Sequence, residues 1–248
     1  MALQTEIKVA PDSSTLADWA AGEFVTLAGQ ALQAGSRFSV ALAGGSTPRQ
    51  LYARLTAAKL DWKKIHFFWG DERCLPPDHK DSNYRMAQEA LLSQIPVPLE
   101  NIHRIPGELP VKDAAREYAE DLRRYFGSLT PRFDLVLLGL GSDGHTASLF
   151  PGKPTVNETT RWVAAVVHDV PPPPLVDRVT LTLHVLNAAA HVLFLVSGLG
   201  KAEILARVLQ GPYQPDLLPA QGVRPVKGNL LWLVNQDAAE LLAPHKQK

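Results

Sequence analysis

The sequence is poor in cysteine and has no excess of charge of either sign. Cys74 is the only cysteine in 248 residues, so no intramolecular disulfide can form and a reducing compartment is expected. Lys and Arg together number 25, as do Asp and Glu, which leaves a formal net charge of zero. Without a basic block the chain lacks the electrostatic footprint for nucleic acid or an anionic membrane, so neither partner is expected.

Targeting and membrane-spanning patterns are also missing. The first residues, Met1–Glu6, show no basic region followed by an apolar core, which predicts no secretory signal and a cytoplasmic location. One uncharged segment, between Arg178 and Lys201, is long enough to cross a bilayer, but it contains Thr180 and His184 among other polar residues. We predict that it forms a buried strand, a short helix and a second buried strand.

Metal-binding and nucleotide-binding motifs are not found. One cysteine and eight scattered histidines show no metal-ligand spacing, so no metal is expected. The glycine-rich segments match neither the P-loop nor the dinucleotide-binding fingerprint. We therefore expect no nucleotide and no other cofactor.

The remaining composition is that of an ordinary globular protein. Hydrophobic residues make up 46% of the chain and charged residues 20%. A chain of this length can bury a large core, and we expect one α/β domain spanning residues 1–248.

Apolar strands alternate with amphipathic helices along the chain. Continuous apolar runs such as 133–138 are typical of strands that are covered on both faces. Further strands are expected at 38–43, 65–69, 192–196 and 230–234, and helices from a cap at Ser13 or Ser14, then at 48–60, 82–92, 111–125, 201–209 and 236–242. The alternation predicts a mostly parallel sheet with helices on both sides. The prolines at 171–174 predict a stiff surface connector.

Ligands of an open α/β sheet bind at the carboxyl ends of its strands, so the residues after each strand are candidates. Gly44 and Gly45 follow the first predicted strand and allow the backbone to approach a ligand closely. Ser46 and Thr47 offer hydroxyl groups at a helix start, where free N–H groups attract an anion such as phosphate. The same residues would also make a plain, well-capped turn.

Three charged residues follow the predicted strand at 65–69. Arg73 could bind phosphate or carboxylate with its planar guanidinium, and Asp71 and Glu72 could orient it or transfer protons. Alternatively, the three residues are a solvated cluster of mutually paired charges. Cys74 beside Arg73 is a weaker candidate, a nucleophile with a lowered pKa, because no base is paired with it.

The segment Gly139–Gly152 is the most informative. It follows a buried strand and opens with three glycines in six residues, among which Asp143 and His145 lie two positions apart. A histidine can accept and return a proton near neutral pH, and a neighbouring carboxylate can select its tautomer. An idle, solvated histidine is the alternative.

Two further cations accompany predicted strands. Lys201 stands in the first turn of a helix, where a positive charge opposes the helix dipole unless an anion compensates, although a plain surface lysine is equally compatible. Arg178, at the start of a strand, is a weaker candidate of the same kind. Together, the strand ends predict a sugar phosphate held by its phosphate group, with acid–base chemistry at His145.

Five segments, in this order, resemble those of the 6-phosphogluconolactonase family: Ala43–Pro48, Trp69–Arg73, Ser82–Arg85, Gly139–Gly152 and Ser197–Ala202. The resemblance covers nearly the whole chain, and the segment around His145 is its most specific part. Asn235 departs from the pattern, since an aspartate is expected there; we expect this position to lie far from the chemistry.

The resemblance implies a Rossmann-like three-layer α/β/α sandwich, similar to glucosamine-6-phosphate deaminase and ribose-5-phosphate isomerase. It implies hydrolysis of 6-phospho-D-glucono-1,5-lactone to 6-phospho-D-gluconate, the second step of the oxidative pentose phosphate pathway, without a cofactor. It also implies that His145 is the catalytic base and that Asp143 supports it. The residues expected to bind the substrate are Gly44, Gly45, Ser46, Thr47, Arg73, Arg178 and Lys201. We expect the protein to be a monomer.

Two other functions remain as alternatives. A sugar-phosphate deaminase or isomerase could share the fold, but the deaminase carries a glutamate where this chain has Phe150, and that glutamate pairs with the histidine. A catalytically silent sugar-phosphate sensor is a second alternative, against which the retained Asp143 and His145 argue.

Overall fold

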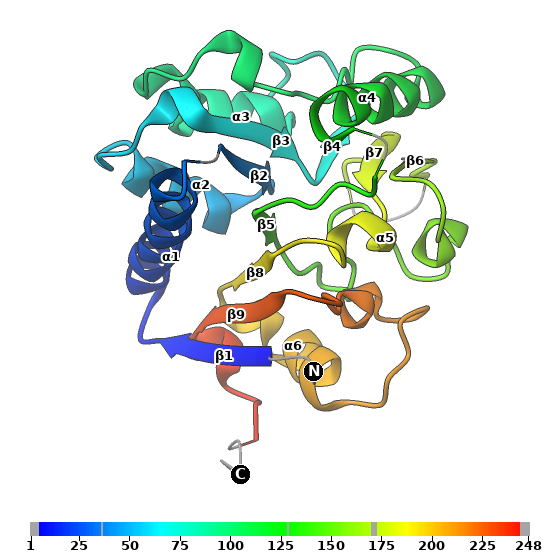
Figure 1. Cartoon of the computed structure of the whole chain (residues 1–248). Helices are drawn as coiled ribbons and strands as arrows, with labels where there is room; N and C mark the ends of the chain where they lie inside the picture. The colour runs from blue at the N-terminus through cyan, green and yellow to red at the C-terminus, as the bar shows by residue number, and fades with distance from the viewer. Residues whose placement is uncertain (1–4, 36, 128, 170–172, 244–248) are drawn as a thin grey trace.

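A six-stranded parallel sheet forms the centre of the fold in the computed structural model, which describes residues 5–35, 37–127, 129–169 and 173–243 (Figure 1). Its strands, in spatial order, are β1 (Thr5–Ala10), β9 (Asn229–Asn235), β8 (His191–Val196), β5 (Leu135–Leu138), β2 (Phe38–Leu42) and β3 (Ile65–Trp69). All five neighbouring pairs run parallel. This confirms the predicted α/β class, while β1, whose residues alternate weakly, was not predicted.

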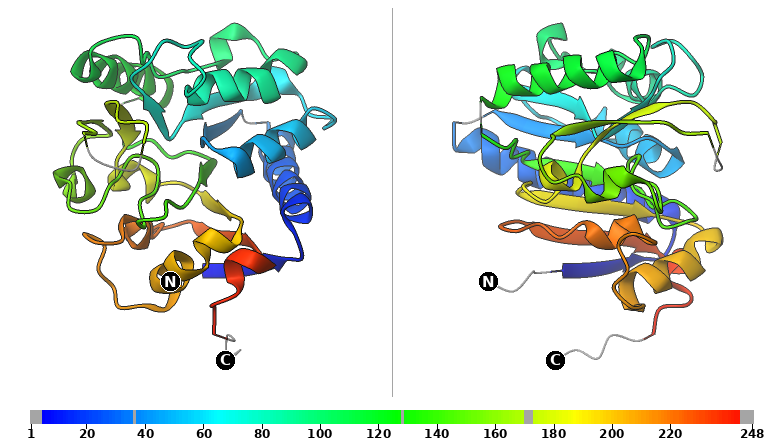
Figure 2. Two further views of the ribbon diagram at one scale, coloured as in Figure 1. Left: turned by 180° about the vertical axis from the view of Figure 1, so that it is seen from behind. Right: turned by 90° about the vertical axis from the view of Figure 1, so that its right-hand side faces the viewer.

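The inner strands are covered on both faces, which their apolar sequences allow. Every residue of β2 and of β5 is buried, and so is nearly every residue of β8. Helix α1 (Ser13–Gln33) lies along one side of the sheet, and the short α5 (Leu183–Leu186) lies on the other (Figures 1 and 2). The segment between Arg178 and Lys201 is therefore strand, short helix and strand, as predicted.

The remaining helices agree with the sequence in place but differ at their ends. They are α2 (Ser46–Leu55), α3 (Asn83–Ala90), α4 (Val111–Phe126), α6 (Ala202–Gln210) and α7 (Gln236–Ala239). Helix α1 is capped by Asp12, whose side chain accepts a hydrogen bond from the Thr15 N–H at 2.7 Å, so the predicted serine cap was wrong. Among the helices in the described part of the chain, none has both the length and the apolar character needed to cross a bilayer.

A second sheet of three antiparallel strands packs beside the first. It consists of β4 (Asp71–Arg73), β7 (Arg178–Leu181) and β6 (Val163–Val166) in the spatial order β4-β7-β6. The charged residues after β3 pair with β7 and form a strand, which was not predicted from the sequence. The proline connector expected at 171–174 lies partly outside the described residues.

Two buried tyrosines complete the hydrogen bonding where inner strands end. The Tyr52 hydroxyl, from α2, donates to the Ala43 carbonyl at 2.8 Å and accepts from the Ala43 N–H at 3.0 Å. The Tyr118 hydroxyl, from α4, makes the same pair of hydrogen bonds to Trp69. Backbone polar groups that leave the sheet inside the core must find other partners, and these hydroxyls supply them.

We predict that Tyr52→Phe and Tyr118→Phe each lower the free energy of unfolding by about 1–3 kcal/mol, because each leaves a buried N–H and a buried carbonyl without a partner. Urea denaturation measures the change. Tyr125→Phe is the matched control, since the buried Tyr125 hydroxyl has no hydrogen-bond partner among the described residues. Equal stability of all three variants would show that the Tyr52 and Tyr118 hydroxyl groups do not stabilise the strand ends.

Candidate active site

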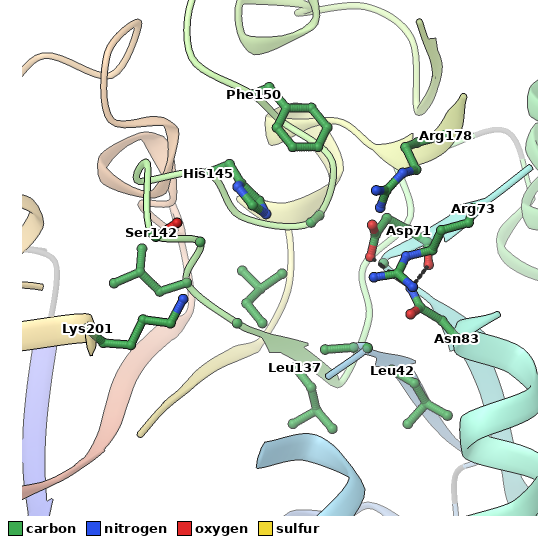
Figure 3. A pocket seen from close by; sticks show the side chains of 18 of the residues that line it. Leu42, Asp71, Arg73, Asn83, Leu137, Ser142, His145, Phe150, Arg178 and Lys201 are labelled. Carbon is green, nitrogen blue, oxygen red and sulfur yellow. Dashed lines mark hydrogen bonds between the residues drawn. The ribbon is translucent and has the colours of Figure 1, made fainter. Parts of the chain in front are cut away.

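A cavity of about 300 Å³ lies at the carboxyl ends of β2, β3 and β5 (Figure 3). The residues that line it come from the ends of these strands, from the loop after β5, from the small sheet and from the start of α6. Its chemically active lining residues are Asp71, Arg73, Asn83, Ser142, His145, Arg178 and Lys201. The cavity therefore gathers residues from distant parts of the sequence, among them five of the nine predicted site residues: Gly44, Arg73, His145, Arg178 and Lys201.

His145 is held by its neighbour Asp143. The imidazole Nδ1 lies 2.6 Å from Asp143 Oδ1, and the same oxygen accepts the His145 backbone N–H at 3.0 Å. Burial raises the pKa of Asp143, but the hydrogen bond from His145 and its charge outweigh burial, so the pKa lies below its usual value. An ionised carboxylate at Nδ1 keeps the proton on that nitrogen and leaves Nε2 to accept a proton.

Two contacts confine the imidazole ring. On Gly141, a Cβ atom would lie 2.1 Å from His145 Nδ1, so only glycine allows the ring to lie against the loop backbone. The Phe150 ring packs at 4.7 Å between centroids, and His168 stacks on Phe150 at 4.2 Å. Among the described residues, Asp143 is the only carboxylate within hydrogen-bonding distance of His145.

Lys201 follows β8 on a 3₁₀ turn at Leu199–Lys201 and reaches the cavity from the side opposite the two arginines (Figure 3). Burial lowers the pKa of Lys201, and the charge of Asp143 opposes that shift. Lys201 forms no ion pair with any side chain in the described ranges. A half-buried cation without a partner fits a site for an anionic ligand.

Arg73 and Arg178 lie at the other end of the cavity. Arg178 donates to the carbonyls of Val176 and Pro174, and burial lowers its pKa. Arg73 donates through Nη1 to the Asp81 carbonyl at 2.5 Å, while its buried Nε has no partner within the described structure. Within the described residues, neither guanidinium forms a hydrogen bond or an ion pair with a carboxylate, so both remain available to an anion.

The glycine segment before α2 lies only partly at the cavity. Gly44 lines it, whereas Gly45, with φ of 104°, forms the N-cap of α2. Ser46 and Thr47 begin the helix outside the lining, and the Thr47 hydroxyl lies 3.0 Å from the Ser197 hydroxyl at the end of β8. The three residues Gly45–Thr47 thus border the site rather than form its wall.

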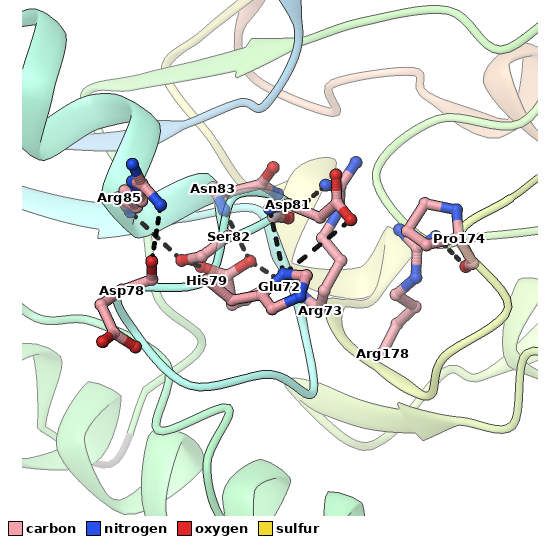
Figure 4. A network of polar contacts seen from close by, with 10 residues as sticks. All are labelled: Glu72, Arg73, Asp78, His79, Asp81, Ser82, Asn83, Arg85, Pro174 and Arg178. Atoms are coloured by element: carbon pink, nitrogen blue, oxygen red, sulfur yellow. Dashed lines mark hydrogen bonds and ion pairs between the residues drawn. The ribbon is translucent and has the colours of Figure 1, made fainter.

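Glu72 has a structural role that the sequence did not distinguish from that of its neighbours. Its carboxylate accepts hydrogen bonds from the backbone N–H groups of Arg73, Asn83 and Tyr84 and from the Ser82 hydroxyl (Figure 4). Burial raises the pKa of Glu72, although these N–H groups oppose the shift. Glu72 therefore anchors the start of α3, where Asn83 lies, and does not line the cavity.

Cys74 is not an activated nucleophile. Burial, together with the nearby charges of Asp177 and Glu72, raises the pKa of the thiol to about 11, which is the opposite of the lowering considered from the sequence. At neutral pH this thiol carries its proton.

Asn235 lies closer to the site than expected. Its Oδ1 accepts from the Gly198 N–H at 3.0 Å, at the turn that leads into Lys201. Its Nδ2 donates to Asp237 Oδ2 at 3.0 Å, a bond that a carboxylate at this position could not make. The amide is therefore matched to its neighbour, and the expected remoteness of position 235 was wrong.

No grouping of three His, Cys, Asp or Glu side chains in the described ranges could hold a metal ion. Sequence reasoning gave no role to Asn83, which lines the cavity beside Asp71. The only sequence signal for it was its place after Ser82, whose hydroxyl caps α3 by accepting from the Arg85 N–H.

Comparisons with known proteins agree with one another. A sequence model of the family described as glucosamine-6-phosphate isomerases/6-phosphogluconolactonase matches residues 11–232. A 6-phosphogluconolactonase of Nostoc sp. is 40% identical over 246 residues, which cover 96% of this chain and 99% of the relative. The structure of 6-phosphogluconolactonase from Trypanosoma brucei superposes with a TM-score of 0.85 at 32% identity, covering 98% of this chain and 100% of that one. A monomeric glucosamine-6-phosphate deaminase shares the fold, with a TM-score of 0.79 at 21% identity over 95% of this chain and 99% of its own.

We predict that Gly141→Ala displaces the His145 imidazole and breaks its hydrogen bond to Asp143, because the added Cβ would overlap Nδ1. Gly139→Ala is the matched control in the same loop, since a Cβ there meets no atom within 4 Å. The Nδ1 proton, observed by ¹⁵N–¹H NMR of the histidine side chain, should lose its hydrogen-bonded resonance only in Gly141→Ala. An unchanged resonance in that variant would contradict the role of Gly141.

Proposed function

The chain belongs to the family of glucosamine-6-phosphate isomerases and 6-phosphogluconolactonases, and we propose that it hydrolyses 6-phospho-D-glucono-1,5-lactone to 6-phospho-D-gluconate. A relative and a solved structure named 6-phosphogluconolactonase, at 30% identity or more over nearly the whole chain, support an enzyme that hydrolyses a lactone. The reaction would be the second step of the oxidative pentose phosphate pathway.

One observation carries the proposal. The His145–Asp143 pair, with Nδ1 hydrogen-bonded to the carboxylate, lies at a cavity whose two ends carry cations that form no ion pair within the described residues. A base between two cationic ends suits a small anionic substrate that must be held while a proton moves.

His145 would act as a general base on water. The neutral imidazole accepts a proton through Nε2 as the water oxygen attacks the lactone carbonyl carbon. The resulting imidazolium is stabilised by ionised Asp143, and it then returns the proton to the ring oxygen as the carbon–oxygen bond breaks. No covalent intermediate is needed: one water is added, and the ring ester becomes a carboxylic acid and a hydroxyl group. The acid then releases its proton to solvent and becomes the carboxylate.

The surrounding groups would hold the substrate and steady the developing charge. Lys201 and the two arginines supply the positive charge for phosphate and for the product carboxylate. Gly44 borders the same cavity, whereas Gly45, Ser46 and Thr47 would contribute through the start of α2 beside Ser197. Backbone N–H groups of the glycine turn after β5 would stabilise the oxyanion.

A deaminase is the second candidate, favoured only by the shared fold. Phe150 argues against it, because an aromatic ring occupies the side of His145 where the deaminase has a glutamate. A silent sensor is disfavoured by the intact His145–Asp143 hydrogen bond.

We predict that His145→Asn lowers kcat by about 10²–10⁴-fold, the usual contribution of a positioned general base, and leaves the fold intact. Lactone loss is measured above the spontaneous background. His184→Asn, which removes a histidine outside the cavity, is the control and should retain activity. A His145→Asn variant with more than about a tenth of wild-type kcat would exclude His145 as the base. Ammonia release from glucosamine 6-phosphate at a comparable rate would instead support the deaminase.

We predict that Lys201→Ala and Arg73→Ala each weaken binding of 6-phosphogluconate about tenfold or more, through loss of a charge-assisted hydrogen bond. Because burial lowers the pKa of Lys201, wild-type affinity should also fall as the pH rises towards that pKa and the ammonium becomes neutral. Calorimetric titration measures both effects. Lys153→Ala, which removes a lysine paired with exposed Asp169, is the control, and unchanged affinity in both cavity variants would move the anion site elsewhere.

A further inference from the structure

Asp71 is a buried carboxylate that the proposed chemistry does not use. It follows Gly70 at the carboxyl end of β3, begins β4 and lines the cavity. Only 8% of its surface is exposed, and the exposed side faces the cavity between Arg73 and Arg178 (Figure 3). A carboxylate buried to this extent needs hydrogen-bond donors to offset the loss of water.

The donors that the protein supplies leave part of this carboxylate unoccupied. Ser148 Oγ donates to Asp71 Oδ2 at 2.6 Å, which is a short, charge-assisted hydrogen bond. Asn83 Nδ2 donates to the Asp71 backbone carbonyl at 3.0 Å and approaches Oδ1 only at 3.4 Å. Neither arginine forms an ion pair with Asp71 in the described structure. Since an ionised carboxylate offers about four acceptor positions, Oδ1 keeps spare capacity on the side of the cavity.

The neighbouring Glu72 shows how this chain satisfies a buried carboxylate that has only a structural role. Three backbone N–H groups and the Ser82 hydroxyl occupy its two oxygens (Figure 4). Glu72 faces away from the cavity and Asp71 faces into it, as expected for adjacent residues of a strand. The two carboxylates are alike in burial, so the incomplete hydrogen bonding of Asp71 is specific to its place at the cavity.

Asn83 is held against Asp71 by a glycine. A Cβ atom on Gly44 would lie 2.0 Å from Asn83 Oδ1, so the amide occupies space that only glycine leaves free. The helix start that carries Asn83 is anchored in turn by Glu72. Asp71 and Asn83 therefore form a pre-organised pair at the cavity wall, with an acceptor in Asp71 Oδ1 and an amide beside it.

The chemistry of this pair selects a class of ligand group. An anionic acceptor repels a phosphate and cannot donate to the lactone carbonyl, whereas it binds a neutral hydroxyl strongly. We propose that Asp71 and Asn83 form a subsite that binds a ring hydroxyl of the substrate, and that they thereby make the enzyme specific for polyhydroxylated phosphorylated lactones. This inference rests on the proposed function. It assigns residues to the ring hydroxyl groups of the substrate, which the cations do not bind.

The experiment compares 6-phosphogluconolactone with its 2-deoxy, 3-deoxy and 4-deoxy analogues on the wild type and on Asp71→Ala. The wild type should prefer the full substrate over at least one analogue by roughly ten- to a hundredfold in kcat/KM, the value of one hydrogen bond to a charged group. In Asp71→Ala that preference should fall to within about twofold, because the variant lacks the carboxylate that would bind the hydroxyl missing from the analogue. Glu89→Gln changes an exposed carboxylate of α3 outside the cavity and should keep the preference.

Two results would overturn the subsite: an unchanged preference in Asp71→Ala, or a wild type that treats all three deoxy analogues like the full substrate. Should Asp71→Ala fail to fold, Asp71→Asn keeps the side-chain volume, and its preference should fall several-fold because a neutral acceptor binds a hydroxyl more weakly. Calorimetric binding of 6-phosphogluconate and of its deoxy counterparts repeats the comparison without turnover. The two proposals can fail separately. If the wild type hydrolyses no lactone, but binds 6-phosphogluconate more tightly than its deoxy counterparts and Asp71→Ala does not, the proposed reaction is contradicted and the subsite is supported.

Discussion

The cavity depends on how the sheet ends. At Ala43 and Trp69 the chain leaves β2 and β3 inside the core, where a carbonyl and an N–H without partners would be costly. One tyrosine hydroxyl satisfies both groups at each strand end. The strands can therefore diverge into separate loops although no water reaches their last backbone groups. The space between those loops is the site. The helices that carry the two tyrosines are thereby held in register with the residues that line the cavity.

The charged side chains around this cavity differ in their surroundings as well as in their residue type. Positive groups stand at both ends, and the two carboxylates at the cavity have different surroundings: Asp143 is engaged by His145, whereas Asp71 keeps an unfilled oxygen. The adjacent Glu72 accepts a hydrogen bond from the backbone at the start of α3. The three acidic residues thus have separate roles: Asp143 orients a base, Asp71 accepts a hydrogen bond from a ligand, and Glu72 anchors the start of a helix.

The sequence predicted the central sheet and the strand-end residues because long apolar runs and glycine turns are local signals. In this way the sequence pointed to His145 and Lys201, which line the cavity, and to Asp143, which contacts His145. The small sheet was missed, since β4 consists of charged residues whose strand character depends on pairing with the distant β7. The lowered pKa considered for Cys74 fails for the same reason, because its raised pKa follows from tertiary burial rather than from the adjacent arginine. Position 235 was misjudged because the contact that matters joins β9 to the turn after β8.

Asn235 joins parts of the chain that are remote in sequence. Its amide contacts Ser13 at the start of α1, Gly198 before Lys201, and Ala238 in α7, at 3.4, 3.0 and 3.1 Å. Truncation within α7 would remove a partner of this amide and loosen the turn that carries Lys201, a residue of the cavity lining, although α7 itself has no residue at the cavity. For protein engineering, a fusion partner or immobilisation linker should therefore be attached beyond α7, so that the helix and the amide that caps it stay intact.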